Sequence, residues 1–210
     1  MKKILLLTVV LFAAFGLSGC NYNSLNAGQQ NVKGKWANVE SQLQRRADLV
    51  ENLVNTAKMA GVQEQEVFGQ IADARSKLLG AGSAAPAEAK TPEQRQAMIE
   101  ANSSFGGTIG RLLSLQESYP QLRSNEAFLK VQDELSGTEN RINISRIDYN
   151  EAVQTYNTER SGFPGIITAT IFGFKEEPYF KADEGAKSVP KVGDPNSLRK
   201  NNTAPAPANK

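Results

Sequence analysis

The longest regular pattern in the sequence is a heptad repeat between Ser124 and Tyr156. Large apolar and aromatic side chains recur every seven residues along one line, and mostly small side chains follow a companion line. The first line is Phe128, Leu135, Ile142, Tyr149 and Tyr156, and the second is Val131, Thr138, Ser145 and Ala152. This spacing is typical of a helix that packs lengthwise against other helices. At 1.5 Å per residue the stretch predicts a helix of roughly 50 Å, along which the other helices must pack.

Three further segments show helical periodicity. They are expected from about Asn31 to Ala60, from about Gln63 to Leu79, and from Pro92 to about Tyr119. Thr91, Pro92 and Gln94 match a capping box with a first-turn proline. Gly80 to Lys90 is rich in Gly, Ala, Ser and Pro, which predicts a flexible connection. We therefore expect an all-α fold, an antiparallel up-down-up-down bundle of about four long helices.

The pattern changes after Tyr156. Phe163-Pro164-Gly165 is expected to end the long helix, and Ile166 to Phe174 is an apolar run of nine residues that is too short to span a membrane. One interpretation, which we favour, is a short helix that caps the open end of the bundle. The other is an exposed apolar site that docks on lipid or on a partner. Residues 181–210 contain four prolines and few apolar side chains, which predicts a disordered tail.

The N-terminus resembles the signal peptide of a bacterial lipoprotein. Two lysines precede an apolar run of 13 residues, Ile4 to Gly16, whereas about 20 residues are needed to cross a bilayer. The run leads to Leu17-Ser18-Gly19-Cys20, which is similar to a lipobox, and Cys20 is the only cysteine, so no intrachain disulfide can form. We predict that residues 1–19 are cleaved, that Cys20 is lipidated and that residues 20–30 form a tether. The alternative is a buried structural cysteine in an ordinary signal anchor.

Composition excludes several classes of function. The chain has no histidine, which removes Ser-His-Asp and Cys-His catalysis, His-ligated zinc and histidine-containing di-iron sites. The formal net charge is +2, and cleavage of Lys2 and Lys3 with the signal peptide leaves 22 basic residues against 22 acidic ones. A neutral mature chain argues against a nucleic-acid partner, which needs a basic surface. We expect no metal and no cofactor.

Carboxylates are the remaining source of catalytic groups. Asp148 and Glu151 lie three residues apart on the heptad helix, but such pairs are common on solvated helix faces. We expect a non-catalytic structural or protein-interaction module. Two alternatives stay open: a hydrolase that uses paired carboxylates, and a small-molecule or lipid carrier with a cavity between its helices.

Charged residues interrupt the apolar lines of the first helix and of the heptad helix. Arg46 occupies an apolar position of the first helix, and an antiparallel arrangement places it opposite the middle of the heptad helix. Because a buried arginine needs a carboxylate, we predict that Arg46 or Arg45 pairs with Glu139, which would fix the helix register, while Asp48 is available to Arg141. The alternative is that these charges all point to water. The predicted structural or interaction layer comprises Arg45, Arg46, Asp48, Glu139, Asn140 and Arg141.

The same segments carry a family resemblance. Thr138-Glu139-Asn140-Arg141-Ile142, followed by Tyr149-Asn150 and Tyr156-Asn157, resembles a signature of the LemA family of bacterial envelope proteins, and Gln42 to Val54 is similar to its other signature. Smaller matches follow in the same order, at Tyr22-Asn23, Trp36, Ala74-Arg75, Tyr119-Pro120, Phe163-Pro164 and Tyr179-Phe180. Family members often have proline where this chain has Glu51, so a kink at that point is not expected.

The resemblance implies a membrane-tethered helical bundle over residues 31–180 and no known reaction. We expect the protein to lie on the extracytoplasmic side of an envelope membrane, held by its lipid, and to bind another envelope protein. An aspartate after the acylated cysteine resembles the inner-membrane retention signal of enteric bacteria. Asn21 stands at that position, which favours the outer membrane where one exists.

Overall fold

The computed structural model describes the backbone of residues 2–180 and the side chains of residues 21–180. Within this part of the chain all regular structure is helical, which confirms the predicted all-α fold. The elements in order are α1 (Lys2–Met59), α2 (Gln65–Ser83), the 3-10 helix η1 (Ala87–Ala89), α3 (Pro92–Ser118), the 3-10 helix η2 (Pro120–Ser124), α4 (Glu126–Ser161) and α5 (Gly165–Phe172). The predicted disordered tail, residues 181–210, lies outside the described residues.

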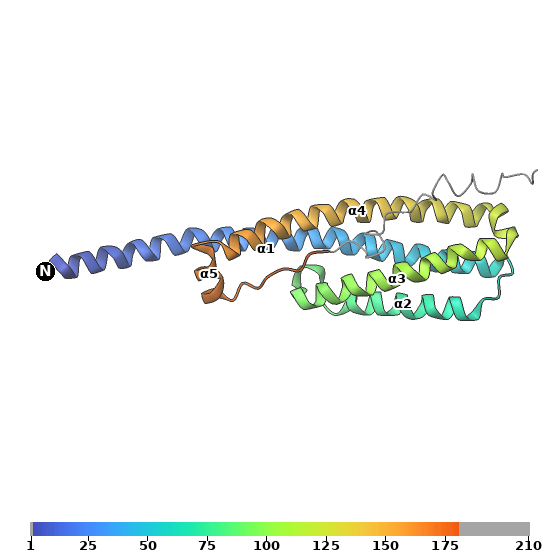
Figure 1. Ribbon diagram of the computed structural model, residues 1–210, viewed down its shortest axis with the longest axis horizontal. Helices are drawn as coiled ribbons and strands as arrows, with labels where there is room; N and C mark the ends of the chain where they lie inside the picture. Colours follow the sequence, from blue (N-terminus) through green and yellow to red (C-terminus); the bar gives the residue numbers. More distant parts are fainter. Residues whose placement is uncertain (1, 181–210) are drawn as a thin grey trace, which may run out of the picture. The chain divides into compact units, whose positions relative to one another are not determined.

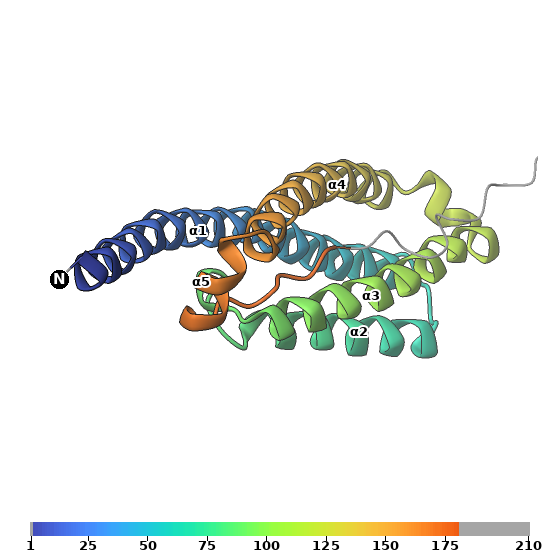
Figure 2. The same cartoon turned by 60° about the vertical axis from the view of Figure 1, so that its left-hand side comes forward.

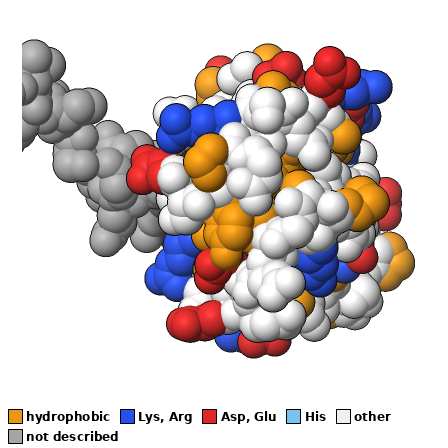
Figure 3. All heavy atoms as spheres, turned by 90° about the vertical axis from the view of Figure 1, so that its right-hand side faces the viewer, with side chains coloured by type: hydrophobic (Ala, Val, Ile, Leu, Met, Phe, Trp, Pro, Cys, Tyr) orange, Lys and Arg blue, Asp and Glu red, His pale blue; other side chains and the backbone are white. Residues whose placement is uncertain are grey.

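The four long helices form two antiparallel pairs. Helix α4 lies along α1, and α2 lies along α3 (Figure 1 and Figure 2). The chain reverses after α1 at Gly61, whose φ of 85° suits glycine, and the Val62 N–H donates to the Ala57 carbonyl at 3.1 Å. The end of the bundle that carries the α1–α2 and α3–α4 connections shows side chains of both charges interspersed with apolar ones (Figure 3).

The core follows the predicted heptad lines. All five residues of the first line on α4 are buried, and so are Thr138 and Ala152 of the companion line. On α1 two seven-residue series of apolar residues are buried, Leu25, Val32 and Val39, and Trp36, Leu43, Val50 and Ala57; Ala47, Leu49, Leu53 and Val54 are buried as well. The rings of Trp36 and Tyr149 meet edge to face with centroids 5.2 Å apart.

The first bundle helix begins earlier than the sequence predicts. We expect it from about Asn31 with a polar tether before it, but α1 is already helical at residues 21–30. Leu25 is fully buried because it continues the seven-residue series of Val32 toward the N-terminus. Gly28 fits in the same turn because its missing side chain leaves room for Tyr156, whose ring carbon would lie 3.3 Å from an added β-carbon.

The connection between α2 and α3 is also more ordered than predicted. Helix α2 continues to Ser83, and the connection contains η1. Lys90 is buried, and its ammonium group donates to Glu40 at 2.8 Å and to the Ala85 carbonyl. A buried lysine with two acceptors fixes the connection. The amino-acid composition of this segment does not reveal such a contact. The predicted capping box of α3 is confirmed, since Thr91 and Gln94 exchange both hydrogen bonds.

Candidate functional site

Arg46 is the centre of a buried polar cluster that joins three helices. It lies on the buried face of α1 and is 8% exposed. Its Nη2 is 3.3 Å from Oε2 of Glu139 on α4, and its Nη1 donates to Oδ1 of Asn102 on α3 at 3.0 Å. The guanidinium carbon also lies 6.0 Å from the centre of the Phe105 ring. The predicted pairing of Arg46 with Glu139 is therefore present, and α3 adds two contacts that the sequence did not indicate.

A glycine makes space for this cluster. A β-carbon on Gly106 would lie 3.4 Å from Nη2 of Arg46, so alanine would touch the guanidinium group and a longer side chain would compete with it for space. The neighbouring Gly107 and Gly110 face open space. Of the three glycines in this part of α3, Gly106 is therefore the one that lies against the cluster.

The other members of the predicted layer lie elsewhere. Arg45, Asn140 and Arg141 are exposed. The predicted contact of Asp48 with Arg141 is wrong, because Asp48 pairs with Arg75 of α2 at 3.2 Å. Asp48 is two residues beyond Arg46, which turns it by about 200° around α1 and away from α4. Arg75 also pairs with Glu51 at 2.7 Å, so it ties α2 to α1 at two carboxylates.

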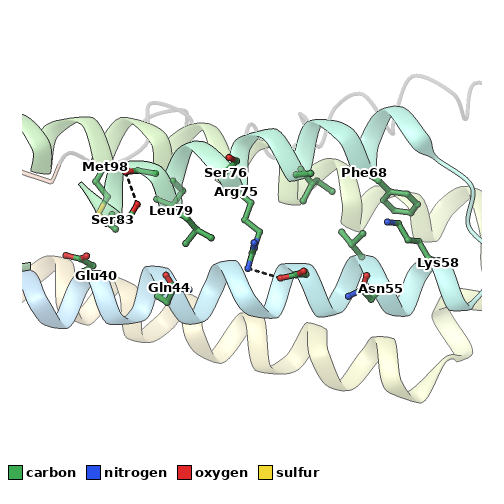
Figure 4. A pocket seen from close by; sticks show the side chains of 17 residues that line it. Glu40, Gln44, Asn55, Lys58, Phe68, Arg75, Ser76, Leu79, Ser83 and Met98 are labelled. Atoms are coloured by element: carbon green, nitrogen blue, oxygen red, sulfur yellow. Dashed lines mark hydrogen bonds and ion pairs between the residues drawn. The ribbon is translucent and has the colours of Figure 1, made fainter. Parts of the chain in front are cut away.

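A groove of about 680 Å³ lies between α1 and α2 (Figure 4). Its walls combine apolar side chains, such as Phe68 and Leu79 of α2, with polar ones, such as Glu40 and Gln44 of α1. The ion pair that Arg75 makes with α1 crosses the space between the two helices (Figure 4). The groove therefore has an amphipathic lining and a fixed ionic bridge.

A second polar cluster holds the chain after α5. Residues 174–180, which we call the latch segment, have no regular secondary structure and lie along α4. Asn150 donates to the Phe180 carbonyl at 2.9 Å and accepts from the Phe180 N–H at 2.8 Å. Asn157 makes the same two bonds with Glu177, at 2.9 Å and 3.0 Å. Each asparagine thus pairs with the latch segment as a neighbouring β-strand would.

The tyrosines beside these asparagines hold the latch segment too. Tyr149 donates to the Pro178 carbonyl and Tyr156 to the Lys175 carbonyl, both at 2.8 Å. Burial, with a smaller contribution from the charge of Glu177, raises the pKa of Tyr156 to about 12 and raises the pKa of Tyr149 as well. Both hydroxyls therefore remain protonated donors at neutral pH.

The spacing of the two Tyr-Asn pairs matches an extended chain. Seven residues of α-helix advance by about 10.5 Å. Three residues of extended chain advance by about 10 Å. Asn150 and Asn157 are seven apart and bind Phe180 and Glu177, which are three apart. The repeat on α4 therefore serves as a ladder for an antiparallel extended segment.

A buried ion pair joins the latch segment to α3. Arg95 and Glu177 are both almost fully buried, and Nη1 of Arg95 donates to Oε2 of Glu177. Burial raises the pKa of Glu177, and the neighbouring Arg95 opposes that shift. This pair was not predicted from the sequence. The available signal was a charged residue on the apolar stripe of α3, the same signal that identified Arg46 on α1.

The carboxylates considered for catalysis do not converge. Asp148 pairs with Lys35 of α1 at 3.1 Å, and Glu151 is exposed on α4. Among the described residues, no three His, Cys, Asp or Glu side chains gather in a way that could hold a metal ion. Within the same part of the chain, no helix combines the length and apolar character needed to cross a membrane.

These features define an all-α bundle whose helices are joined by an arginine-centred cluster and whose C-terminal segment is held by a Tyr-Asn ladder. The chain belongs to the LemA family, whose family model matches residues 35–193. It is 30% identical over 193 residues to the magnetosome proteins MamQ 1 and MamQ 2 of Paramagnetospirillum magneticum, covering 85% of this chain and 70% of each relative. It is 27% identical over 195 residues to the magnetosome protein MamQ of Magnetospirillum gryphiswaldense, covering 86% of this chain and 71% of the relative. The predicted family resemblance is confirmed.

Proposed function

We propose that the protein is a lipid-anchored, non-catalytic module of the cell envelope whose helical surface binds another envelope protein. The observation that carries this proposal is an exposed apolar strip on the outer face of α4. Ile144 is 62% exposed and Ile147 is 59% exposed, and their spacing places them on one face of the helix with the exposed Asn140. The opposite face of α4 is buried in the core, so the strip is presented on a rigid support.

The ionic groups inside the bundle support a structural role. Arg46, Arg75 and Arg95 each join helices or hold the latch segment, and their carboxylate partners are used in those contacts. A catalytic pair of carboxylates would instead face a common cleft.

The anchoring part of the proposal rests on the lipobox-like sequence that ends at Cys20. Fractionation of cells that produce Cys20→Ser tests it. We expect the variant to keep its signal peptide and to lose the acylated N-terminus, as measured by the intact mass. Cleavage after Gly19 and retention on membranes after a high-salt wash would contradict lipidation.

The interaction is tested by site-specific photo-crosslinking in intact cells. A photoreactive residue at Ile147 should give one discrete adduct, whose intensity falls when Ile144 is replaced by Lys. The control position is Met59, an exposed apolar residue of α1 that is 80% exposed. Adducts that are identical at both positions, or the lack of any adduct at Ile147, would contradict the proposed surface.

The groove between α1 and α2 favours a second candidate function, carriage of a small amphipathic molecule or lipid. Its lining suits such a ligand, because apolar walls would hold a chain and the Arg75 bridge would meet a polar group. The variant Ala72→Trp would fill part of the groove. A bound mass seen by native mass spectrometry of the wild type and missing from this variant would support carriage, whereas equal spectra would count against it.

A further inference from the structure

Helix α5 exposes a large apolar surface. It packs through Gly165, Thr168 and Ala169, which are buried against the rest of the bundle. The exposed residues are Phe163 (85%), Ile166 (51%), Ile167 (50%), Ile171 (71%) and Phe172 (57%), and we call them the α5 apolar face. Soluble proteins rarely leave so many large apolar side chains together in water.

The exposed hydroxyl of α5 is bonded within the helix. The helix contains no charged residue. The hydroxyl of Thr170, which is exposed, donates to the Ile166 carbonyl at 2.8 Å. The helix ends at Gly173, whose φ of 72° is left-handed, and the Phe174 N–H donates back to the Ala169 carbonyl at 3.0 Å. An exposed surface that is apolar apart from one hydroxyl bonded within the helix suits a lipid environment better than a protein partner, which is selected by directional polar contacts.

The α5 apolar face lies at the level of α1 where the chain would meet a membrane. The Phe172 ring is 4.8 Å from the Tyr22 ring, and a β-carbon on Gly165 would lie 3.6 Å from Oδ1 of Asn21. Asn21 directly follows Cys20, the predicted lipidation site. Figure 2 shows α5 beside this part of α1.

We propose that the α5 apolar face inserts into the lipid surface of the membrane that tethers the chain. This inference rests on the membrane tether of the proposed function. The anchor and α5 would then give two points of attachment and fix the orientation of the bundle. Tyr22 suits the interfacial region, where tyrosine is enriched, and Phe163 and Phe172 suit the apolar boundary beneath it.

The position of α5 is fixed by the latch segment. Arg160 donates to the Phe174 carbonyl at 2.8 Å, and Tyr156 holds the next residue, Lys175, at its carbonyl. The chain that leaves α5 is therefore bound to α4 within two residues of the helix end. A fixed α5 presents its apolar face without the entropy cost of ordering a free segment.

The test uses the full-length acylated protein in vesicles of phosphatidylethanolamine and phosphatidylglycerol. In Ile171→Cys the introduced thiol is the free one, because Cys20 carries the lipid, and it is labelled with an environment-sensitive fluorophore. Ile147→Cys is the matched control, since Ile147 is also an exposed isoleucine but lies on the outer face of α4. We expect a blue-shifted emission at position 171 and at least threefold stronger quenching by lipids brominated on their acyl chains than at position 147.

The outcomes separate the inference from the tether. Vesicle flotation after a salt wash, together with water-like emission at position 171, would overturn the inference and leave the tether standing. Failure to float would overturn both. Equal quenching at the two positions would show that the bundle lies flat on the lipid and would overturn a specific role of α5. A blue shift in cell membranes but not in pure lipid would assign the face to a protein partner, which also overturns the proposal.

Discussion

The Tyr-Asn ladder makes a quantitative prediction for Asn157→Ala. The substitution removes both hydrogen bonds to the backbone of Glu177, of 2.9 Å and 3.0 Å. Each such bond contributes about 0.5–1.5 kcal/mol net. Glu177 is buried, so its N–H and carbonyl would lose their partners away from water. We therefore expect a loss of roughly 2 kcal/mol in the free energy of unfolding, which corresponds to roughly 4–8 °C in Tm for a domain of this size.

The control for this prediction is Asn143→Ala on the exposed face of the same helix. Both substitutions improve the helix propensity of α4 by roughly 0.5 kcal/mol, so their difference isolates the contacts with the latch segment. Urea unfolding of the two variants measures that difference, and hydrogen exchange at the Glu177 amide reports the latch segment directly. Equal unfolding free energies with unchanged protection at Glu177 would refute the ladder as a stabilising device.

Three further predictions address other parts of the bundle. A double-mutant cycle of Arg46→Ala and Glu139→Ala, measured by urea unfolding, should give a coupling free energy of about 1 kcal/mol between the two side chains, because one is buried and the other is partly exposed. If the losses of stability in the single variants simply add up in the double variant, the pairing is excluded. The contact with Lys175 lowers the pKa of Glu93 from 4.5 to about 2, so the contribution of this contact to stability is present above pH 4.5 and is lost as pH falls toward 2. In Glu93→Gln the free energy of unfolding should therefore depend less on pH between 4.5 and 2, and a pH dependence equal to that of the wild type would contradict this. In Gly165→Ala the new β-carbon collides with the Glu159 carbonyl, which should detach α5 and expose it to limited proteolysis, whereas wild-type resistance would show that the contact can relax.

The apolar seam was predictable from the sequence because periodicity directly reports which side of a helix is buried. The first heptad line of α4 is buried as predicted, with half of the companion line, and the capping box of α3 has the predicted bonds. Arg46 could be paired with Glu139 because a charge on an apolar stripe needs a partner and the antiparallel topology limits the choice. In both cases, local information and one assumption about topology were enough.

The failures share a physical cause. The partner of Asp48 depends on where α2 lies around α1, and periodicity does not encode that lateral position. The latch segment has no repeating pattern, so its contacts with Asn150 and Asn157 exist only in the folded chain. The start of α1 was missed because residues 21–30 are mostly polar, and Leu25 gains its burial from tertiary packing.

The polar clusters solve a problem that the apolar seam leaves open. A heptad seam can slip by seven residues and still place apolar side chains opposite one another, which is why coiled coils use polar residues to fix their register. A slip of one heptad would move α4 by about 10 Å along α1. It would separate Arg46 from Glu139 and would also carry α5 away from Asn21 and Tyr22. The residues that fix the register in the middle of the bundle therefore also determine how close the α5 apolar face lies to the N-terminal anchor.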